Sequence, residues 1–248
     1  MSNKYKKTYL TSVIIRIDLA SPISEIEKGL PKNITKNILK FFPISEPQKV
    51  TEGSIKFESA AIQTGPTRLL TIWNFYGKER EKTLSVAEQN LFIEYRTYKS
   101  FENLKEEFLS VLNAYLKDFP DAQINRLGLR YVNNIEIYES NPTDWHEYIS
   151  GDLLSSFKIT SNEEKLTRNF HILGAVKDEC NLTFQFGMHN PDYPAPIKKK
   201  VFILDFDSYF QGEQEISGIE KNIELSHELI QKYFEKSITQ KLRLKMNK

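Results

Sequence analysis

The sequence contains one cysteine, Cys180, in 248 residues. A single cysteine cannot form an intramolecular disulfide, and it cannot build the thiolate cage of a structural metal site. The fold must therefore be held together by its core. We expect Cys180 to be a buried, inert thiol in a protein of a reducing compartment.

Long apolar runs are also absent. The basic N-terminus is followed only by the short run VII before Arg16 and Asp18, whereas a secretory signal needs roughly 7–15 apolar residues. No later window approaches the roughly 20 apolar residues of a transmembrane helix. The sequence thus predicts a soluble, cytoplasmic protein with no membrane partner.

The sequence also has no excess of positive or negative charge. Lys and Arg total 34 against 33 acidic residues, which gives a formal net charge of +1. A near-neutral surface does not favour the strongly salt-dependent binding of phosphate backbones, so any basic site must be local. The apolar fraction of 40%, with 12% aromatic residues, is ample for a packed core in one large domain or two small ones.

Familiar catalytic and cofactor motifs are lacking too. The sequence has no GxSxG, GxxxxGK[ST] or GxGxxG motif, so we expect no cofactor. Its four histidines, at 146, 171, 189 and 227, have no metal-ligand spacing. His189 is the best placed for chemistry because it begins a proline-rich loop with Asn190 and Asp192. Acid–base catalysis needs no linear motif, so we favour a non-enzymatic role and leave catalysis open.

The pattern of apolar residues predicts one order of elements written twice: strand, helix, three strands, helix. Helix 101–119 has the clearest amphipathic stripe, and helix 144–157 would be capped by Asp144. The predicted strands are 11–20, 49–60, 67–77, 85–98, 124–138, 166–176, 181–189 and 198–210, and the other predicted helices are 21–42 and 216–238.

Equivalent residues of the two halves keep a nearly constant offset, as a true duplication requires. VIIRID over LGLRYV matches Arg16 with Arg130, and FIEYRTY over ILDFDSY matches Glu94 with Asp205. We therefore predict an α+β fold, a single globular domain over 1–248 made of two β-α-β-β-β-α repeats, about 8–120 and 121–240. The repeats would form an antiparallel sheet with long amphipathic helices packed on one face.

The stretch RLGLRYVNN, residues 126–134, places Arg126, Gly128 and Arg130 on one face of its strand and apolar residues on the other. We expect this strand to pair with the strand of Arg16, with the guanidinium groups pointing away from the helices. Gly128 indicates either a bulge, a position beneath a large aromatic such as Trp73, or room for a ligand.

Four stretches carry a resemblance that spans most of the chain: RLGLRYVN, TIWNF, LFIEYRTYKSF and FEKSIT. With them the sequence resembles a sporadically distributed family of uncharacterised prokaryotic proteins. That family has no established activity, so the resemblance implies no catalytic residues. Its patchy occurrence is similar to that of mobile or defence-linked genes, which is an associational hint.

Three functions fit these observations. The first is a non-enzymatic binding or interaction protein, an accessory or neutralising partner of a neighbouring gene product, with a homodimer as a further assembly. The second is nucleic-acid or nucleotide binding, with arginines for phosphates and an aromatic ring for stacking. The third is a metal-dependent hydrolase using Asp205 and Asp207, unless these carboxylates are solvated or paired with arginines on neighbouring strands. The candidate ligand- or partner-binding residues are Arg16, Arg96, Arg126, Arg130, Asn134, Trp73, Tyr131 and His189.

Overall fold

The computed structural model describes residues 5–53, 55–58, 61–64, 67–160 and 164–248. Its main feature is a ten-stranded antiparallel sheet with the order β10-β11-β12-β9-β1-β8-β7-β6-β2, in which β3 also pairs with β6. The expected α+β class with an antiparallel sheet is confirmed. The strands are β1 (Leu10–Leu19), β2 (Ile44–Ser45), β3 (Gln48–Glu52), β6 (Arg68–Tyr76), β7 (Lys82–Val86), β8 (Asn90–Tyr95), β9 (Ile124–Glu136), β10 (Asn169–Lys177), β11 (Cys180–Met188) and β12 (Val201–Gln211).

The two strands at the centre of the sheet are β1 and β9, which begin the two halves of the chain. They pair antiparallel, with Arg16 opposite Gly128 and Ile14 opposite Arg130. Outward from β9 lie β12, β11 and β10, and outward from β1 lie β8, β7 and β6. On both sides, therefore, the first strand of a half is followed outward by the last strand of that half's meander and then by the two strands that precede it in the chain.

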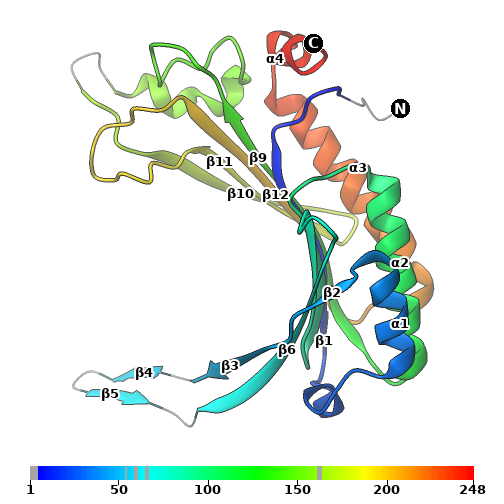
Figure 1. The fold of residues 1–248 in the computed structure, drawn as a ribbon. Coiled ribbons are helices and arrows are strands. Elements are labelled where there is room, and N and C mark those ends of the chain that lie inside the picture. The colour runs from blue at the N-terminus through cyan, green and yellow to red at the C-terminus, as the bar shows by residue number, and fades with distance from the viewer. Residues whose placement is uncertain (1–4, 54, 59–60, 65–66, 161–163) are drawn as a thin grey trace.

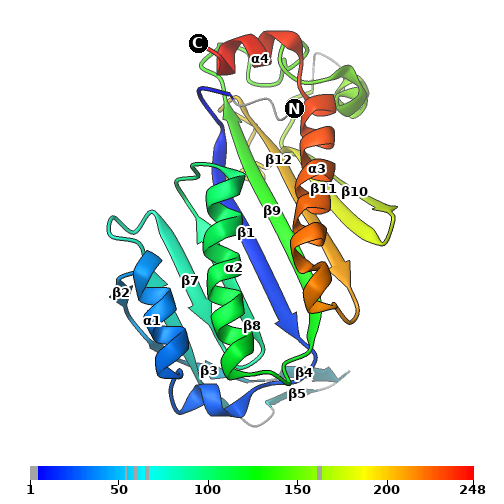
Figure 2. The same cartoon turned by 90° about the vertical axis from the view of Figure 1, so that its right-hand side faces the viewer.

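Among the described residues, four α-helices accompany the sheet: α1 (Lys32–Phe41), α2 (Phe101–Asp118), α3 (Ile219–Ser237) and α4 (Gln240–Met246). Figure 2 shows α1, α2 and α3 in front of the strands. The predicted amphipathic helix is confirmed as α2, whose N-cap Ser100 accepts a hydrogen bond from the backbone N–H of Asn103. No helix in the described part of the chain is long and apolar enough to span a membrane.

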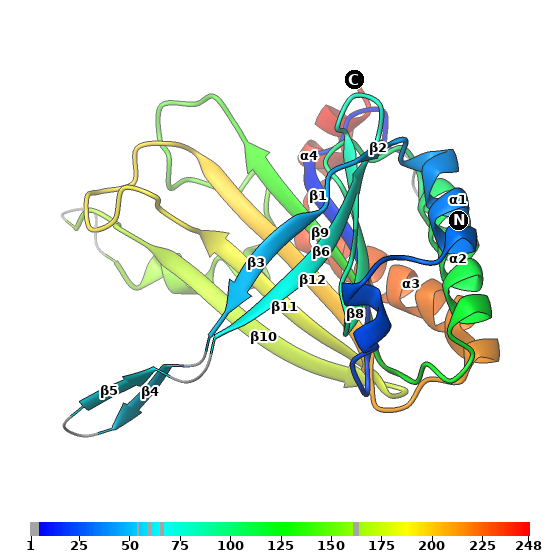
Figure 3. The ribbon, with the colours of Figure 1, turned by 60° about the horizontal axis from the view of Figure 1, so that its bottom comes forward.

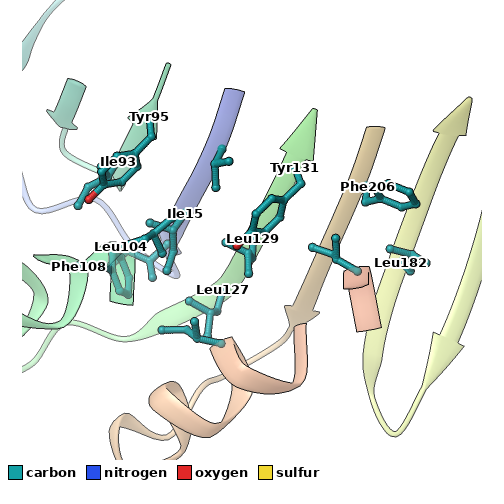
Figure 4. Close-up of a cluster of buried hydrophobic side chains, with 14 of the residues drawn as sticks. Ile15, Ile93, Tyr95, Leu104, Phe108, Leu127, Leu129, Tyr131, Leu182 and Phe206 are labelled. Atoms are coloured by element: carbon teal, nitrogen blue, oxygen red, sulfur yellow. The ribbon is translucent and has the colours of Figure 1, made fainter. Parts of the chain in front are cut away.

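The core lies between the sheet and these helices. Alternate residues of β1, such as Ile15, and of β9, such as Leu129, are fully buried and point toward the helical side. Figure 4 shows Leu104 and Phe108 of α2 among the side chains of β1, β8 and β9. The residues between the buried ones must therefore point to the opposite face of the sheet.

Several predicted elements differ in the structure, and helix 21–42 is one of them, since it becomes the 3-10 helix η1 (Ser24–Glu27) and α1. Residues 144–157 are not a helix; they form turns and the short 3-10 helices η2 (Gly151–Leu153) and η3 (Ser155–Lys158). Asp144 accepts a 3.4 Å hydrogen bond from the backbone N–H of His146 and also contacts Nδ1 of the same residue. The buried Trp145 and Ile149 dock this turn on the core, and Gly151, two residues after Ile149, disfavours a continuing helix.

The strands predicted at 49–60 and 85–98 are each divided. The first becomes β3 and β4 (Ile55–Glu58), and β4 forms a separate hairpin with β5 (Ala61–Thr64). Residues 54, 59 and 60 of this prediction lie outside the described residues. The second is cut by a tight turn in which the backbone N–H of Ala87 donates to the carbonyl of Asn90 at 2.9 Å. The predicted strand thus covers only the last two residues of β7, Ser85 and Val86, and all of β8.

The sheet is strongly curved (Figure 1). Helices α1–α3 lie on its convex side, and none of the helices in the described residues enters the concave side in that view. The ribbon of β3 and β6 with the β4–β5 hairpin projects at one end, as Figure 3 also shows, and β10–β12 project at the other. The central strands therefore present an open, concave surface between two projections.

Candidate functional site

The concave side of the central strands carries a set of charged side chains, which we call the arginine face. They occupy alternate positions on β1, β9 and β12, between residues that point into the core. Because the three strands are adjacent, their charged residues lie side by side. The arginine face consists of Arg16, Asp18, Arg126, Arg130, Asp205 and Asp207.

Ion pairs connect these side chains across the strands. Arg130 binds Asp205 through two hydrogen bonds, at 2.8 Å from Nε to Oδ1 and at 2.6 Å from Nη2 to Oδ2. Arg126 donates to Asp207 at 3.0 Å and lies 3.7 Å from Asp18. Arg16 completes the series by donating from Nε to Asp18 at 2.8 Å. Each arginine thus has a carboxylate, and the face is ordered before any ligand arrives.

The electrostatics of the face follow from partial burial. Burial raises the pKa of Asp207, an effect that the nearby charges of Arg126 and Arg130 oppose. The hydrogen bond with Asp205 raises the pKa of Arg130. Asp205 is only 7% exposed, and the bidentate guanidinium of Arg130 supplies hydrogen bonds to both of its oxygens.

Gly128 has a definite role in this face. A β-carbon at position 128 would lie only 2.6 Å from Nη1 of Arg126. The Arg126 guanidinium therefore passes over the glycine, where it lies 4.7 Å from the ring centre of Tyr209, the residue opposite Gly128 on β12. The missing side chain makes room for an arginine of the same strand, and the prediction that Trp73 covers it is wrong.

The structure does not bring all predicted residues to this face. Trp73 donates from Nε1 to the carbonyl of Ile26 at 2.8 Å and packs against the core. Tyr131 is buried on the helical side, where it contacts His227 of α3. Neither ring can stack on a ligand held by the arginine face, because the sheet lies between them. Successive side chains of a strand point to opposite faces, so Tyr131 and its neighbour Arg130 lie on opposite sides of the sheet.

The remaining candidates lie at the margins. Arg96 is exposed just beyond the end of β8, and Asn134 is exposed near the end of β9. His189 is exposed in the loop between β11 and β12, where its ring lies 6.0 Å from that of Phe170. The buried Asn190 beside it donates to the carbonyls of Thr167 and Ala195. This loop is therefore held by internal hydrogen bonds.

The pairing also bears on phosphate and metal binding. Three arginines on the face are matched by three aspartates, so a phosphate would have to compete with carboxylates already in place. For the same reason Asp205 and Asp207 are engaged by guanidinium groups rather than turned toward each other. Within the described ranges, no group of three or more His, Cys, Asp and Glu residues could hold a metal ion.

A second site on the helical side was missed by sequence reasoning. Here a cavity of about 710 Å³ is lined by residues of the N-terminal segment, β9, α2 and α3. The hydroxyls of Tyr98 and Tyr131 are 2.9 Å apart, and the Tyr131 hydroxyl lies 3.1 Å from Nδ1 of His227. No linear pattern could join these residues, because the three come from distant parts of the chain.

The fold and the arginine face together define a class: an α+β protein with one helix-covered sheet face and one open, charged face. No protein-family model matches the chain, and no curated protein is significantly similar to it. The function must therefore be inferred from the geometry of the chain itself.

Proposed function

We propose that this is a non-enzymatic binding protein that holds a protein partner on its arginine face. The partner would be the product of a neighbouring gene in a mobile or defence-linked system, which this chain assists or neutralises in the cytoplasm. The observation that carries the proposal is the ordered series of ion pairs on an open, concave surface. A surface that is rigid before binding loses little conformational entropy when a partner docks.

The charge balance favours a protein over a nucleic acid. Nucleic-acid sites present unpaired cations, whereas here each arginine is paired with an aspartate. The guanidinium groups still have donors to offer, because each has five N–H groups. The side chains of Arg16 and Arg130 are 43% and 42% exposed. Such half-exposed, fixed arginines are common energetic centres of protein interfaces.

Apolar side chains lie between the charges. Ile14 is opposite Arg130, and Phe92 is opposite Arg16; both are half-buried. Directly paired residues of antiparallel strands share a face, so these two side chains flank the ion pairs. A partner that covers this surface gains apolar burial around a polar centre, the usual composition of a protein interface.

We also infer that the two halves descend from a duplicated unit whose central strands made this face. Support comes from the symmetric strand order and from the register in which Ile15 pairs with Leu129. A twofold axis through that pair relates Arg16 to Arg130. The strands next to the central pair, β8 and β12, support a different match there. Phe92 lies opposite Arg16 and Asp207 lies opposite Arg130, so Phe92 would correspond to Asp207. The match of Glu94 with Asp205 predicted from the sequence would then not hold.

The test is co-expression of the tagged chain with the products of adjacent genes, followed by purification and measurement of Kd. We expect one of these products to form a stable complex. Arg16→Glu should weaken it at least about tenfold, the loss of one interface centre. Lys221→Glu, the same charge change on the exposed part of α3, is the matched control and should bind like the wild type.

Two results would count against the proposal. One is the recovery of only free protein with every adjacent product. The other is a complex that Arg16→Glu and Lys221→Glu affect equally, which would place the partner elsewhere on the surface.

A further inference from the structure

The cavity on the helical side has the dimensions of a small-molecule site. Its volume of about 710 Å³ lies within the range of roughly 300–1,000 Å³ found for ligand pockets. Figure 2 shows β9 in the space between α2 and α3, and Tyr131 and Asn133 of this strand line the cavity. The sheet separates this cavity from the arginine face, so the two sites are independent.

The buried part of the cavity lining is largely aromatic. Tyr131 and Asn133 of β9 line it and are 5% and 4% exposed. The His227 ring stacks on Phe101, with centres 3.8 Å apart and planes at 3°. Burial lowers the pKa of His227 to about 4, so the imidazole is neutral at pH 7. Four charged side chains of the lining are exposed, Lys99, Glu102, Glu228 and Lys232, and the half-buried Glu235 is paired with Arg243.

Two polar atoms of the lining have no partner in the described part of the chain. Asn133 donates from Nδ2 to the carbonyl of Leu204 at 3.2 Å, which leaves its side-chain oxygen as a free acceptor. His227 uses only Nδ1, in its contact with Tyr131, and Nε2 is unused. Polar atoms left open in an otherwise apolar cavity are the groups that orient a ligand.

The hydrogen-bonded series Tyr98–Tyr131–His227 adds a directional constraint. If Tyr98 donates to Tyr131 and Tyr131 donates to Nδ1, the imidazole proton is on Nε2, which becomes a donor. If the series runs the other way, Nε2 is an acceptor and the Tyr98 hydroxyl donates outward. In either direction, the Tyr98 hydroxyl and Nε2 of His227 together offer one donor and one acceptor.

We propose that this cavity binds a small, neutral, planar molecule that carries a hydrogen-bond donor beside an acceptor, the pattern of a carboxamide or of a nucleobase edge. The flat ring system would pack against aromatic walls such as Phe101. The donor and acceptor would satisfy Nε2 of His227 together with the Tyr98 hydroxyl or the oxygen of Asn133. Because Glu235 is already paired with Arg243, a charged ligand would lose its hydration inside without meeting an unpaired opposite charge.

The experiment is a calorimetric or NMR titration at pH 7.5 with nicotinamide and adenosine, which represent the two sources of this chemistry. Nicotinate is the charged control, and toluene is the apolar control. We expect nicotinamide or adenosine to bind at least about tenfold more tightly than both controls. Tighter binding of nicotinamide assigns the carboxamide, and tighter binding of adenosine assigns the nucleobase.

Variants locate the binding. Tyr98→Phe and His227→Phe each keep an aromatic ring and remove one polar end, so each should weaken binding about three- to tenfold. Tyr138→Phe removes the hydroxyl of a 90% exposed tyrosine and should change nothing. In the wild type, the nitrogen chemical shifts of His227 should move on binding, which tests the site even if a variant folds poorly.

The proposal is overturned if neither compound binds better than nicotinate and toluene. It is equally overturned if one binds without any response of the His227 nitrogens. Because both compounds are assayed on the free chain, failure here leaves the partner complex of the arginine face unaffected.

Discussion

The burial of His227 should make the stability of the fold depend on pH between about 4 and 6.5. In the folded chain burial lowers the pKa of this residue from 6.5 to about 4, while nearby Glu102 acts in the opposite direction. The unfolded chain therefore takes up a proton as the pH falls through 6.5, and the folded chain does not. The stability is complete above pH 6.5 and is lost as the pH falls toward 4.

The magnitude follows from the two pKa values. Each unit of difference corresponds to about 1.36 kcal/mol between the protonation states. At pH 5 the linkage amounts to about 2 kcal/mol, because the unfolded imidazole is almost fully protonated and the folded one is almost neutral. This is a large share of the roughly 5–15 kcal/mol by which domains are stable.

The assay is urea unfolding of the wild type and of His227→Phe at pH 7.5 and pH 5.0. Phenylalanine retains a ring to stack on Phe101 and cannot titrate. Other titrating groups are common to both proteins and cancel in the comparison. Between the two pH values the wild type should lose about 2 kcal/mol more than the variant. Equal losses in both proteins would refute the reasoning, since His227 would then be free to protonate in the fold.

Three further substitutions test other parts of the structure by chemical unfolding. Arg130→Ala leaves the buried Asp205 without its bidentate partner and should cost about 2 kcal/mol; no loss would mean that water replaces the guanidinium. Lys82→Met strands the buried Glu107, 2.7 Å from the ammonium, and should cost about 3–5 kcal/mol. A Glu107→Leu change in the same chain should recover part of that loss. Ser100→Ala removes the N-cap of α2 and should cost about 1 kcal/mol; an unchanged midpoint would show that the cap contributes nothing.

Regular periodicity made part of this structure predictable. The stripe of apolar residues that includes Leu104 and Phe108 defines α2, and the alternation on β9 puts Arg126 and Arg130 on one face. These local patterns depend only on the geometry of a helix or a strand. The pairing of β1 with β9 followed from matching the two halves, and the antiparallel register bears that pairing out.

The rest depended on contacts that no local pattern encodes. The segment around Trp145 has helical spacing, but its buried side chains dock a turn against the core. Tyr131 shares a strand with the arginines yet serves the opposite face, where Tyr98 and His227 reach it from elsewhere in the chain. The ion pair of Arg126 with Asp207 likewise needed the position of β12. Tertiary neighbours decided these roles.

The central position of β1 and β9 has a consequence for the order in which the chain folds. During synthesis β1 can pair with β8 as soon as the first meander is complete, but its other edge has no neighbour until β9 emerges. Such pairing between distant segments is intrinsically slow. A nascent first half therefore carries an open strand edge in the middle of its future sheet, and the second half closes it on arrival.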